Sequence, residues 1–127
     1  MRTINSIEAL KAIEKRNKVC GNTSEYIMAL VDNLEGGCNT MEEKAAEAAA
    51  IEYIVRLCEV EIMIHTRNTL LGNKNSFIEE KIENPPHHTC GIMKKMIYIN
   101  RLVHECRNDL ENANVFIEQD YIEKKCA

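Results

Sequence analysis

Six basic side chains are the residues of this chain whose types and spacing are best suited to chemistry. They flank a segment with two prolines: Arg67, His87, His88, Lys94, Lys95 and Arg101. Lys94 and Lys95 fall in the first turns of a predicted helix, where the helix dipole disfavours cations by about 0.3–1 kcal/mol each. The free N–H groups of a helix start bind anions, and nearby Lys and His side chains would complete such a site. The sequence therefore predicts an anion site here, for a phosphate, a nucleotide or an acidic partner surface.

Two alternative interpretations of the same six residues remain open. Runs of charge usually lie in solvent, so these side chains could simply form a solvated face. They could also dock on the acidic end of a second subunit. The acidic residues that we expect at that opposite end are Glu42, Glu43, Glu47, Glu111, Glu118 and Asp120.

Metal and thiol chemistry have less support in the sequence. The run from His87 to Cys90 is a single group of ligands, whereas a zinc site usually combines two such groups, and Cys20 and Cys38 stand alone. Cys90 is the best candidate nucleophile because two histidines precede it, and a reactive thiol needs a base and an electropositive setting. We predict no metal, no cofactor and no catalytic residue, and keep a thiol enzyme as an alternative.

The segment 95–105 resembles the active-site helix of the HEPN family, whose members are small helical bundles and include toxin and defence ribonucleases. In that motif four to six residues separate an Arg from a His, and an Asn commonly follows the Arg. Asn100 and His104 match, but positions 97–99 hold no Arg and Arg101 lies too close to the His. The resemblance implies a HEPN-like helical protein without the catalytic Arg, which should not cleave RNA by the family mechanism.

Apolar residues spaced by three and four predict the helices that position these side chains. The last helix, about 90–120, carries one such seam: Ile92, Met96, Ile99, Val103, Cys106, Leu110, Ala113 and Ile117. A helix over about 41–71 begins at a Thr40–Glu43 capping box and ends at Gly72. It has apolar residues on more than one face, which predicts more than one neighbour.

We expect these two long helices to pair as an antiparallel hairpin because their seams match in length. The register that we expect places Cys58 opposite Cys106 and gathers the six basic residues at one end. Two short helices precede the hairpin, one ending near Gly21 and one spanning about residues 23–34. We find no internal repeat and predict an all-α helical bundle that forms a single domain over residues 1–127.

Composition restricts the class of protein further. The 16 Lys and Arg against 20 Asp and Glu give a net charge of −4, which argues against general nucleic-acid binding. We find neither a signal-peptide pattern nor a membrane-length apolar window, so we expect a cytoplasmic protein with reduced cysteines and no membrane partner.

These observations favour a non-enzymatic helical module that binds or inhibits a protein partner or associates with itself as a homo-oligomer. A phage-type counter-defence protein would fit this description. The first alternative is a binder of an anionic small molecule, such as a phosphate or nucleotide, at the basic end. The second is the HEPN-like protein without the catalytic Arg.

Overall fold

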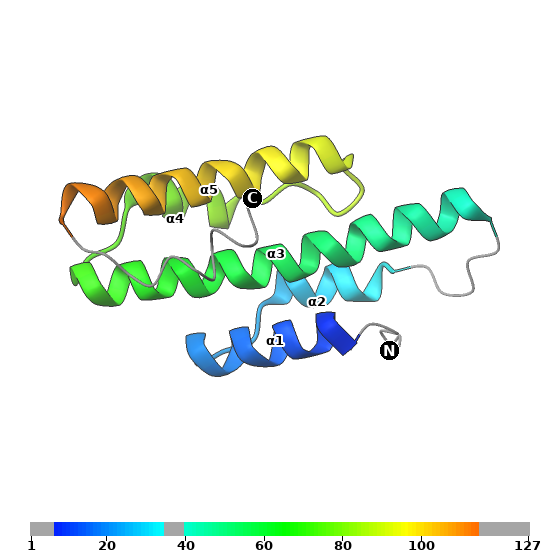
Figure 1. Cartoon of the computed structure of the whole chain (residues 1–127), viewed down its shortest axis with the longest axis horizontal. Helices are drawn as coiled ribbons and strands as arrows, with labels where there is room; N and C mark the ends of the chain where they lie inside the picture. The colour runs from blue at the N-terminus through cyan, green and yellow to red at the C-terminus, as the bar shows by residue number, and fades with distance from the viewer. Residues whose placement is uncertain (1–6, 35–39, 115–127) are drawn as a thin grey trace.

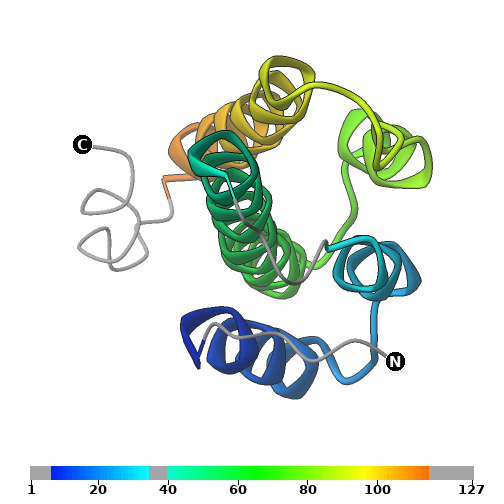
Figure 2. The ribbon, with the colours of Figure 1, turned by 90° about the vertical axis from the view of Figure 1, so that its right-hand side faces the viewer.

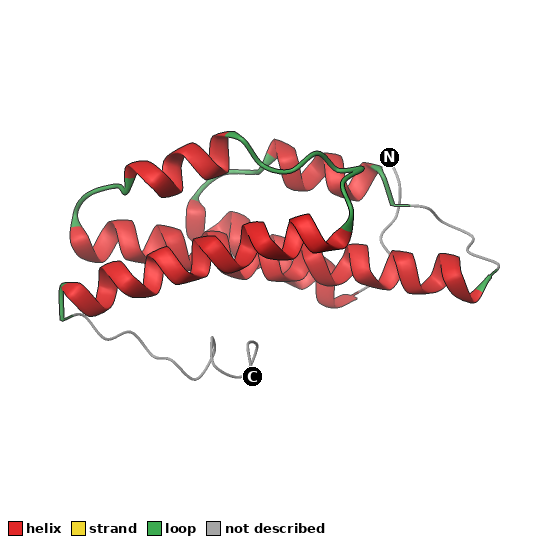
Figure 3. Ribbon diagram, turned by 90° about the horizontal axis from the view of Figure 1, so that it is seen from above, coloured by secondary structure: helices red, strands yellow, loops and turns green. Residues whose placement is uncertain are grey.

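A computed structural model describes residues 7–34 and 40–114 of the chain. These residues form five helices: α1 (Ile7–Cys20), α2 (Glu25–Asp32), α3 (Met41–Leu71), α4 (Ser76–Glu83) and α5 (Ile92–Asn112). No strand occurs within the described ranges, which confirms the all-α prediction (Figures 1 and 3). Over the same residues, no helix has an apolar stretch long enough to span a bilayer.

Local sequence signals set most of the helix ends. The Thr40 side chain accepts a hydrogen bond from the Glu43 N–H (3.0 Å), so the predicted cap of α3 is confirmed. Gly72 ends α3 in the left-handed conformation with φ of 70°, as predicted for a C-terminal glycine. Ser24 caps α2 in the same way as Thr40 caps α3, by accepting from the Ile27 N–H.

The long helix α3 lies at the centre of the molecule, between α1 and α5 (Figure 2). Its middle is buried on several sides, with Tyr53, Leu57 and Cys58 fully buried. The prediction that this helix has more than one neighbour is therefore confirmed. The first turns of α3 project beyond α5 and leave Met41 largely exposed (Figures 1 and 3).

The relative direction of the two long helices differs from the prediction, because α3 and α5 run parallel (Figure 1). The Lys95 ammonium lies over the Tyr53 ring, and Arg67 pairs with Asp109. Each pair is separated by 42 positions. A constant difference between residue numbers identifies a parallel pair, whereas an antiparallel pair has a constant sum.

The connection between α3 and α5 explains this reversal. The α4 helix runs back along the molecule and residues 84–91 continue in the same direction, so α5 starts from the end at which α3 also starts (Figure 1). An antiparallel hairpin needs only a short loop, whereas this crossover returns the chain before α5 begins. The predicted register was therefore wrong. Cys58 has Arg16 and Glu61 near it, while Cys106 has Arg67 and Asp109, so the two thiols lie in different helix interfaces.

The last helix is shorter than predicted. It ends at Asn112, and the Ala113 and Asn114 N–H groups donate to carbonyls of its final turn. Asn114 has a φ of 56°, a left-handed conformation that stops a helix and that Asn tolerates better than most residues. The predicted continuation through Ile117, Glu118 and Asp120 lies outside the described residues.

The helices form two layers (Figure 2). The first contains α1, α3 and α5, which all run in the same direction, and the second contains the shorter α2 and α4, which run back (Figure 1). Each short helix contacts the long helix that follows it in the chain, α2 with α3 and α4 with α5. The molecule is therefore a stack of helix pairs, an arrangement typical of helical repeat proteins.

An internal repeat underlies this stack and corrects the expectation that the chain has none. Helix ends and caps recur at a spacing of 51 residues: Cys20 and Leu71, Gly21 and Gly72, Ser24 and Asn75, Glu25 and Ser76, Asn33 and Asn84. Gly21 and Gly72 share a positive φ, of 77° and 70°. Asn33 and Asn84 each donate their side-chain amide to the carbonyl four residues earlier. Residues 7–34 and 58–85 therefore adopt one repeated helix–turn–helix unit.

Candidate functional site

The predicted basic residues at the start of α5 are held in part by the crossover. The Lys95 ammonium donates to the His88 carbonyl (2.8 Å) and lies 5.3 Å from the centre of the Tyr53 ring. Lys95 is buried, which lowers its pKa. The His87 ring pairs with the Thr89 hydroxyl and stacks at an angle on His88. Lys95 therefore fastens the crossover to α3.

Two tyrosines continue this attachment into the core. The Tyr26 hydroxyl donates to the Pro86 carbonyl (2.6 Å) and pairs with the Tyr53 hydroxyl (2.8 Å). Burial, together with the hydrogen bond that the Tyr53 hydroxyl donates to Tyr26, raises the pKa of Tyr53. Helix α2, helix α3 and the crossover thus share one buried polar network, which satisfies groups that would otherwise be costly to bury.

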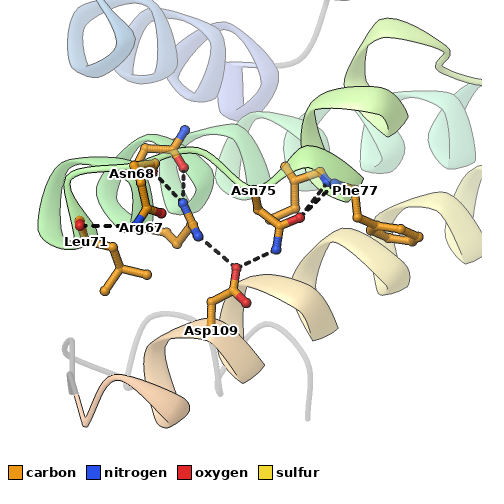
Figure 4. Close-up of polar contacts among 8 residues, drawn as sticks. Arg67, Asn68, Leu71, Asn75, Phe77 and Asp109 are labelled. Carbon is orange, nitrogen blue, oxygen red and sulfur yellow. Dashed lines mark hydrogen bonds and ion pairs between the residues drawn. The ribbon is translucent and has the colours of Figure 1, made fainter.

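Arg67 lies away from the other five predicted site residues, near the end of α3 (Figure 4). Its Nε donates to Asp109 Oδ2 (3.0 Å), while its Nη1 donates to Asn68 Oδ1 and to the Asn73 carbonyl. Asn75, which caps α4, donates to the same carboxylate oxygen (2.7 Å). Arg67 is only 4% exposed, so it holds α3, the turn and α5 together.

Arg16 makes the same set of contacts one repeat earlier. Its Nε donates to Glu61 Oε1 on α3 (2.7 Å), and its Nη1 donates to Asn17 Oδ1 and to the Asn22 carbonyl. Each of these Arg residues therefore binds the Asn that follows it, the carbonyl six residues later and a carboxylate on the next long helix. We call this arrangement the arginine clamp.

Arg107 is a third Arg-Asn pair near the end of a long helix. It precedes the last residue of α5 by five positions, whereas Arg16 and Arg67 precede the ends of α1 and α3 by four. Its Nε and Nη2 are buried and have no hydrogen-bond partner among the described residues. A buried donor without a partner costs about 1–3 kcal/mol, so this side chain calls for an explanation.

Arg101 lies in a groove of about 420 Å³ between α4 and α5. Lining residues of this groove are Phe77, Ile97, Asn100, Arg101, His104 and Glu105. Phe77 and Ile97 are exposed, so the groove combines apolar side chains with charged groups of both signs, Arg101 and Glu105. Asn100 and His104, the residues that match the HEPN motif, are also exposed here.

The structure therefore does not assemble the six predicted residues into one pocket. His87, His88 and Lys95 meet in the crossover, Lys94 is exposed in the first turn of α5, and Arg101 lies farther along that helix. The predicted division into a basic and an acidic end was wrong for the described residues. The parallel arrangement brings the start of α5 alongside α3 and places Arg67 beside Asp109.

The thiols differ in their surroundings. Cys58 and Cys106 are buried and free, and burial raises the pKa of each to about 12. Cys90, the candidate nucleophile, is half-buried, and the nearby His87 ring nitrogen is paired with Thr89. Among residues 7–34 and 40–114, no group of three or more His, Cys, Asp or Glu side chains could hold a metal ion.

A second hollow of about 460 Å³ lies between helices α3 and α4 and the turn that joins α1 to α2. Its charged lining contains the Arg16–Glu61 pair and the longer Lys74–Glu79 pair (3.8 Å). His65, on the same wall, is exposed.

Comparison of the chain with protein-family models, with curated proteins and with solved structures found no match.

Proposed function

We propose that this protein is a non-enzymatic helical repeat module that binds a protein partner through the α4–α5 groove. The observation that carries the proposal is that two exposed apolar side chains, Phe77 of α4 and Ile97 of α5, line this groove from its two helices. Apolar side chains exposed together, with polar groups at the edge, are typical of protein interaction sites. Met93, one turn before Ile97, is 75% exposed and extends the apolar surface along α5.

The stacked architecture supports this function. Repeat proteins present side chains from successive units on a continuous surface, and they use that surface for binding. The groove is built in this way, because Phe77 comes from the second short helix and Ile97 from the long helix that follows. Arg101 and Glu105 also line the groove, so a partner should place polar groups beside its apolar anchor.

Site-specific photo-crosslinking in the native host tests the proposal. A photoreactive residue at Ile97 should give a discrete adduct with one protein, which mass spectrometry would identify. Leu70 is the matched control, because it is also 50% exposed but lies near the end of α3 and does not line the groove. Phe77→Asp should remove the adduct and leave the fold intact, since an Asp is tolerated in the first turn of α4. Equal adducts from both positions, or none from position 97, would refute the proposal.

A further inference from the structure

We infer that the α4–α5 groove receives an extended, proline-containing segment of the partner protein. The inference rests on the proposed function and adds to it the backbone conformation and the chemistry of the partner. It follows from the internal repeat. The corresponding place one unit earlier, between α2 and α3, is filled by an extended proline-containing stretch of this chain itself, residues 84–91.

The repeat identifies the residues of the groove that correspond to a pair of tyrosines in the first unit. Tyr26 and Phe77 each stand second in their short helix. Tyr53 and His104 each stand thirteenth in the long helix that follows. The hydroxyls of the two tyrosines pair at 2.8 Å, and Phe77 and His104 line one groove. The two pairs therefore occupy the same place in successive units.

In the first unit, residues 84–91 fill this place. The Pro86 carbonyl accepts a hydrogen bond from the Tyr26 hydroxyl (2.6 Å). The His88 carbonyl, two residues on, accepts from the Lys95 ammonium (2.8 Å), which also lies over the ring of the second tyrosine. The site therefore takes a stretch of chain whose backbone carbonyls accept hydrogen bonds from side chains.

Two successive prolines set the conformation of that stretch. Proline fixes its own φ at about −65° and disfavours the helical conformation for the residue before it. Asn84 and Pro85 each precede a proline, and residues 85–87 lie in neither a helix nor a turn. The chain therefore crosses the tyrosine pair with an extended backbone that the prolines hold in place.

In the second unit the same place is uncovered. Tyr53 is fully buried and Tyr26 is half-buried, whereas Phe77 and His104 are both exposed. Within residues 7–34 and 40–114, no segment lies over the groove in the way that residues 84–91 lie over the tyrosines. A partner segment with the same properties would therefore complete the second unit.

Hydrogen-bonding capacity, and not net charge, selects a proline-containing segment. The groove carries both Arg101 and Glu105, so its charge favours neither sign. The Arg101 guanidinium and the His104 ring offer N–H donors to backbone carbonyls. A proline brings no N–H that would itself need an acceptor in the groove. Its ring and its preformed extended backbone suit the apolar surface of Phe77 and Ile97 at a low entropic cost.

Selection from two libraries of displayed short peptides tests the inference. One library has a fixed Pro-Pro pair at the centre of random residues, and the other has Ala-Ala, which favours a helix. The immobilised wild-type protein should enrich the Pro-Pro library at least about tenfold more strongly. Ile97→Ser should abolish this enrichment. Leu70→Ser is the matched control, because Leu70 is equally exposed and lies outside the groove, and it should keep the enrichment.

The selected peptides then test the two positions that correspond to the tyrosines. Phe77→Tyr restores the hydroxyl that binds Pro86 in the first unit, so it should tighten binding about three- to tenfold. His104→Phe keeps an aromatic ring and removes the N–H donor, so it should weaken binding by a similar factor. Both positions are exposed, so neither change should disturb the fold.

The possible outcomes separate this inference from the proposed function. Enrichment of the Ala-Ala library alone would overturn the inference and leave the proposed function standing, with a helix as the occupant. Pro-Pro enrichment that survives Ile97→Ser would place the binding outside the groove and overturn the inference. Without enrichment of either library the inference fails, and the crosslinking at Ile97 decides the proposed function separately. A wild-type dimer that dissociates on Ile97→Ser would make a second copy the occupant and also overturn the inference.

Discussion

Arg67 and Arg107 lie near the ends of two successive parallel helices, and both precede an Asn, but their surroundings differ. Arg67 is closed on three sides, by Asn68, the turn carbonyl of Asn73 and Asp109 of the next helix. The Arg107 Nε and Nη2 have none of these partners among the described residues. The difference shows that the clamp acts between units, because its carboxylate comes from the following long helix.

The residues that precede the two arginines in their helices differ in polarity. Where α3 has Val60 and Ile64 before its clamp Arg, α5 has Asn100 and His104. This face of α5 is therefore polar and exposed at Asn100 and His104, where α3 is apolar and buried.

The largest expected effect is the loss of stability when the arginine of either clamp, Arg16 or Arg67, is replaced. Arg67→Met and Arg16→Met should each lower the free energy of unfolding by about 3–5 kcal/mol, because each leaves a carboxylate between helices without its cation. Urea denaturation followed by circular dichroism measures this loss. Asp109 keeps its hydrogen bond from Asn75, so the loss for Arg67→Met should lie at the lower end. Losses below about 1 kcal/mol would show that the clamps do not hold the stack.

The two buried thiols extend the comparison to the pH dependence of stability. Cys58 lies near Arg16 in one helix interface, and Cys106 lies near Arg67 in the other. Their folded-state pKa values of about 12 exceed the unfolded value of 9.0, so the unfolded chain releases protons first as the pH rises. The contribution of each thiol to the free energy of unfolding is complete below pH 9. It falls between pH 9 and 12, by up to about 1.4 kcal/mol per pH unit for each thiol.

Denaturation at pH 8 to 10.5 checks this expectation. Cys58→Ala and Cys106→Ala should each make the fall less steep, whatever they do to stability at pH 8. An unchanged slope in both variants would show that the thiols ionise equally in the two states.

The turns give a smaller effect. Gly21→Ala and Gly72→Ala should each lower the free energy of unfolding by about 1–2 kcal/mol, because Ala is strained at a positive φ. No atom lies within 4 Å of an added Cβ at either position, so the loss reflects the backbone alone. Asn114→Gly should instead stabilise slightly, since Asn114 already accepts φ of 56° at some cost. Thermal melts that rank these three variants differently would contradict the shared turn.

The smallest expected effect belongs to Arg107. Arg107→Met should leave stability unchanged or raise it by up to about 1 kcal/mol, because it replaces unpaired buried donors with an apolar side chain. The same denaturation measurement as for Arg67→Met makes the contrast direct. A loss as large as that of Arg67→Met would mean that Arg107 is already paired, which would contradict this expectation.

Local spacing predicted much of the fold. The helix start at Thr40, the stop at Gly72 and the burial of Ile99, Cys106 and Leu110 all follow from patterns within a few residues. The contacts of the candidate site were harder to predict from the sequence. Arg67 and Lys95 are basic residues near a turn and a helix start, and nothing local shows that each has a partner in a distant segment. The signal that would have helped was the Arg-Asn pair with Gly-Asn five residues on, at Arg16 and again at Arg67.

The sequence by itself determined where α3 starts and stops, and that α3 needs several neighbours. These properties depend on capping and on the 3.6-residue period, which act over one or two turns. Only the tertiary structure decided the direction of α5, because an apolar seam packs equally well on a parallel or an antiparallel helix. The short α4 and the crossover, fixed by Lys95 and Tyr26, return the chain and make the pair parallel. The same parallel stacking brings Asp109 to Arg67.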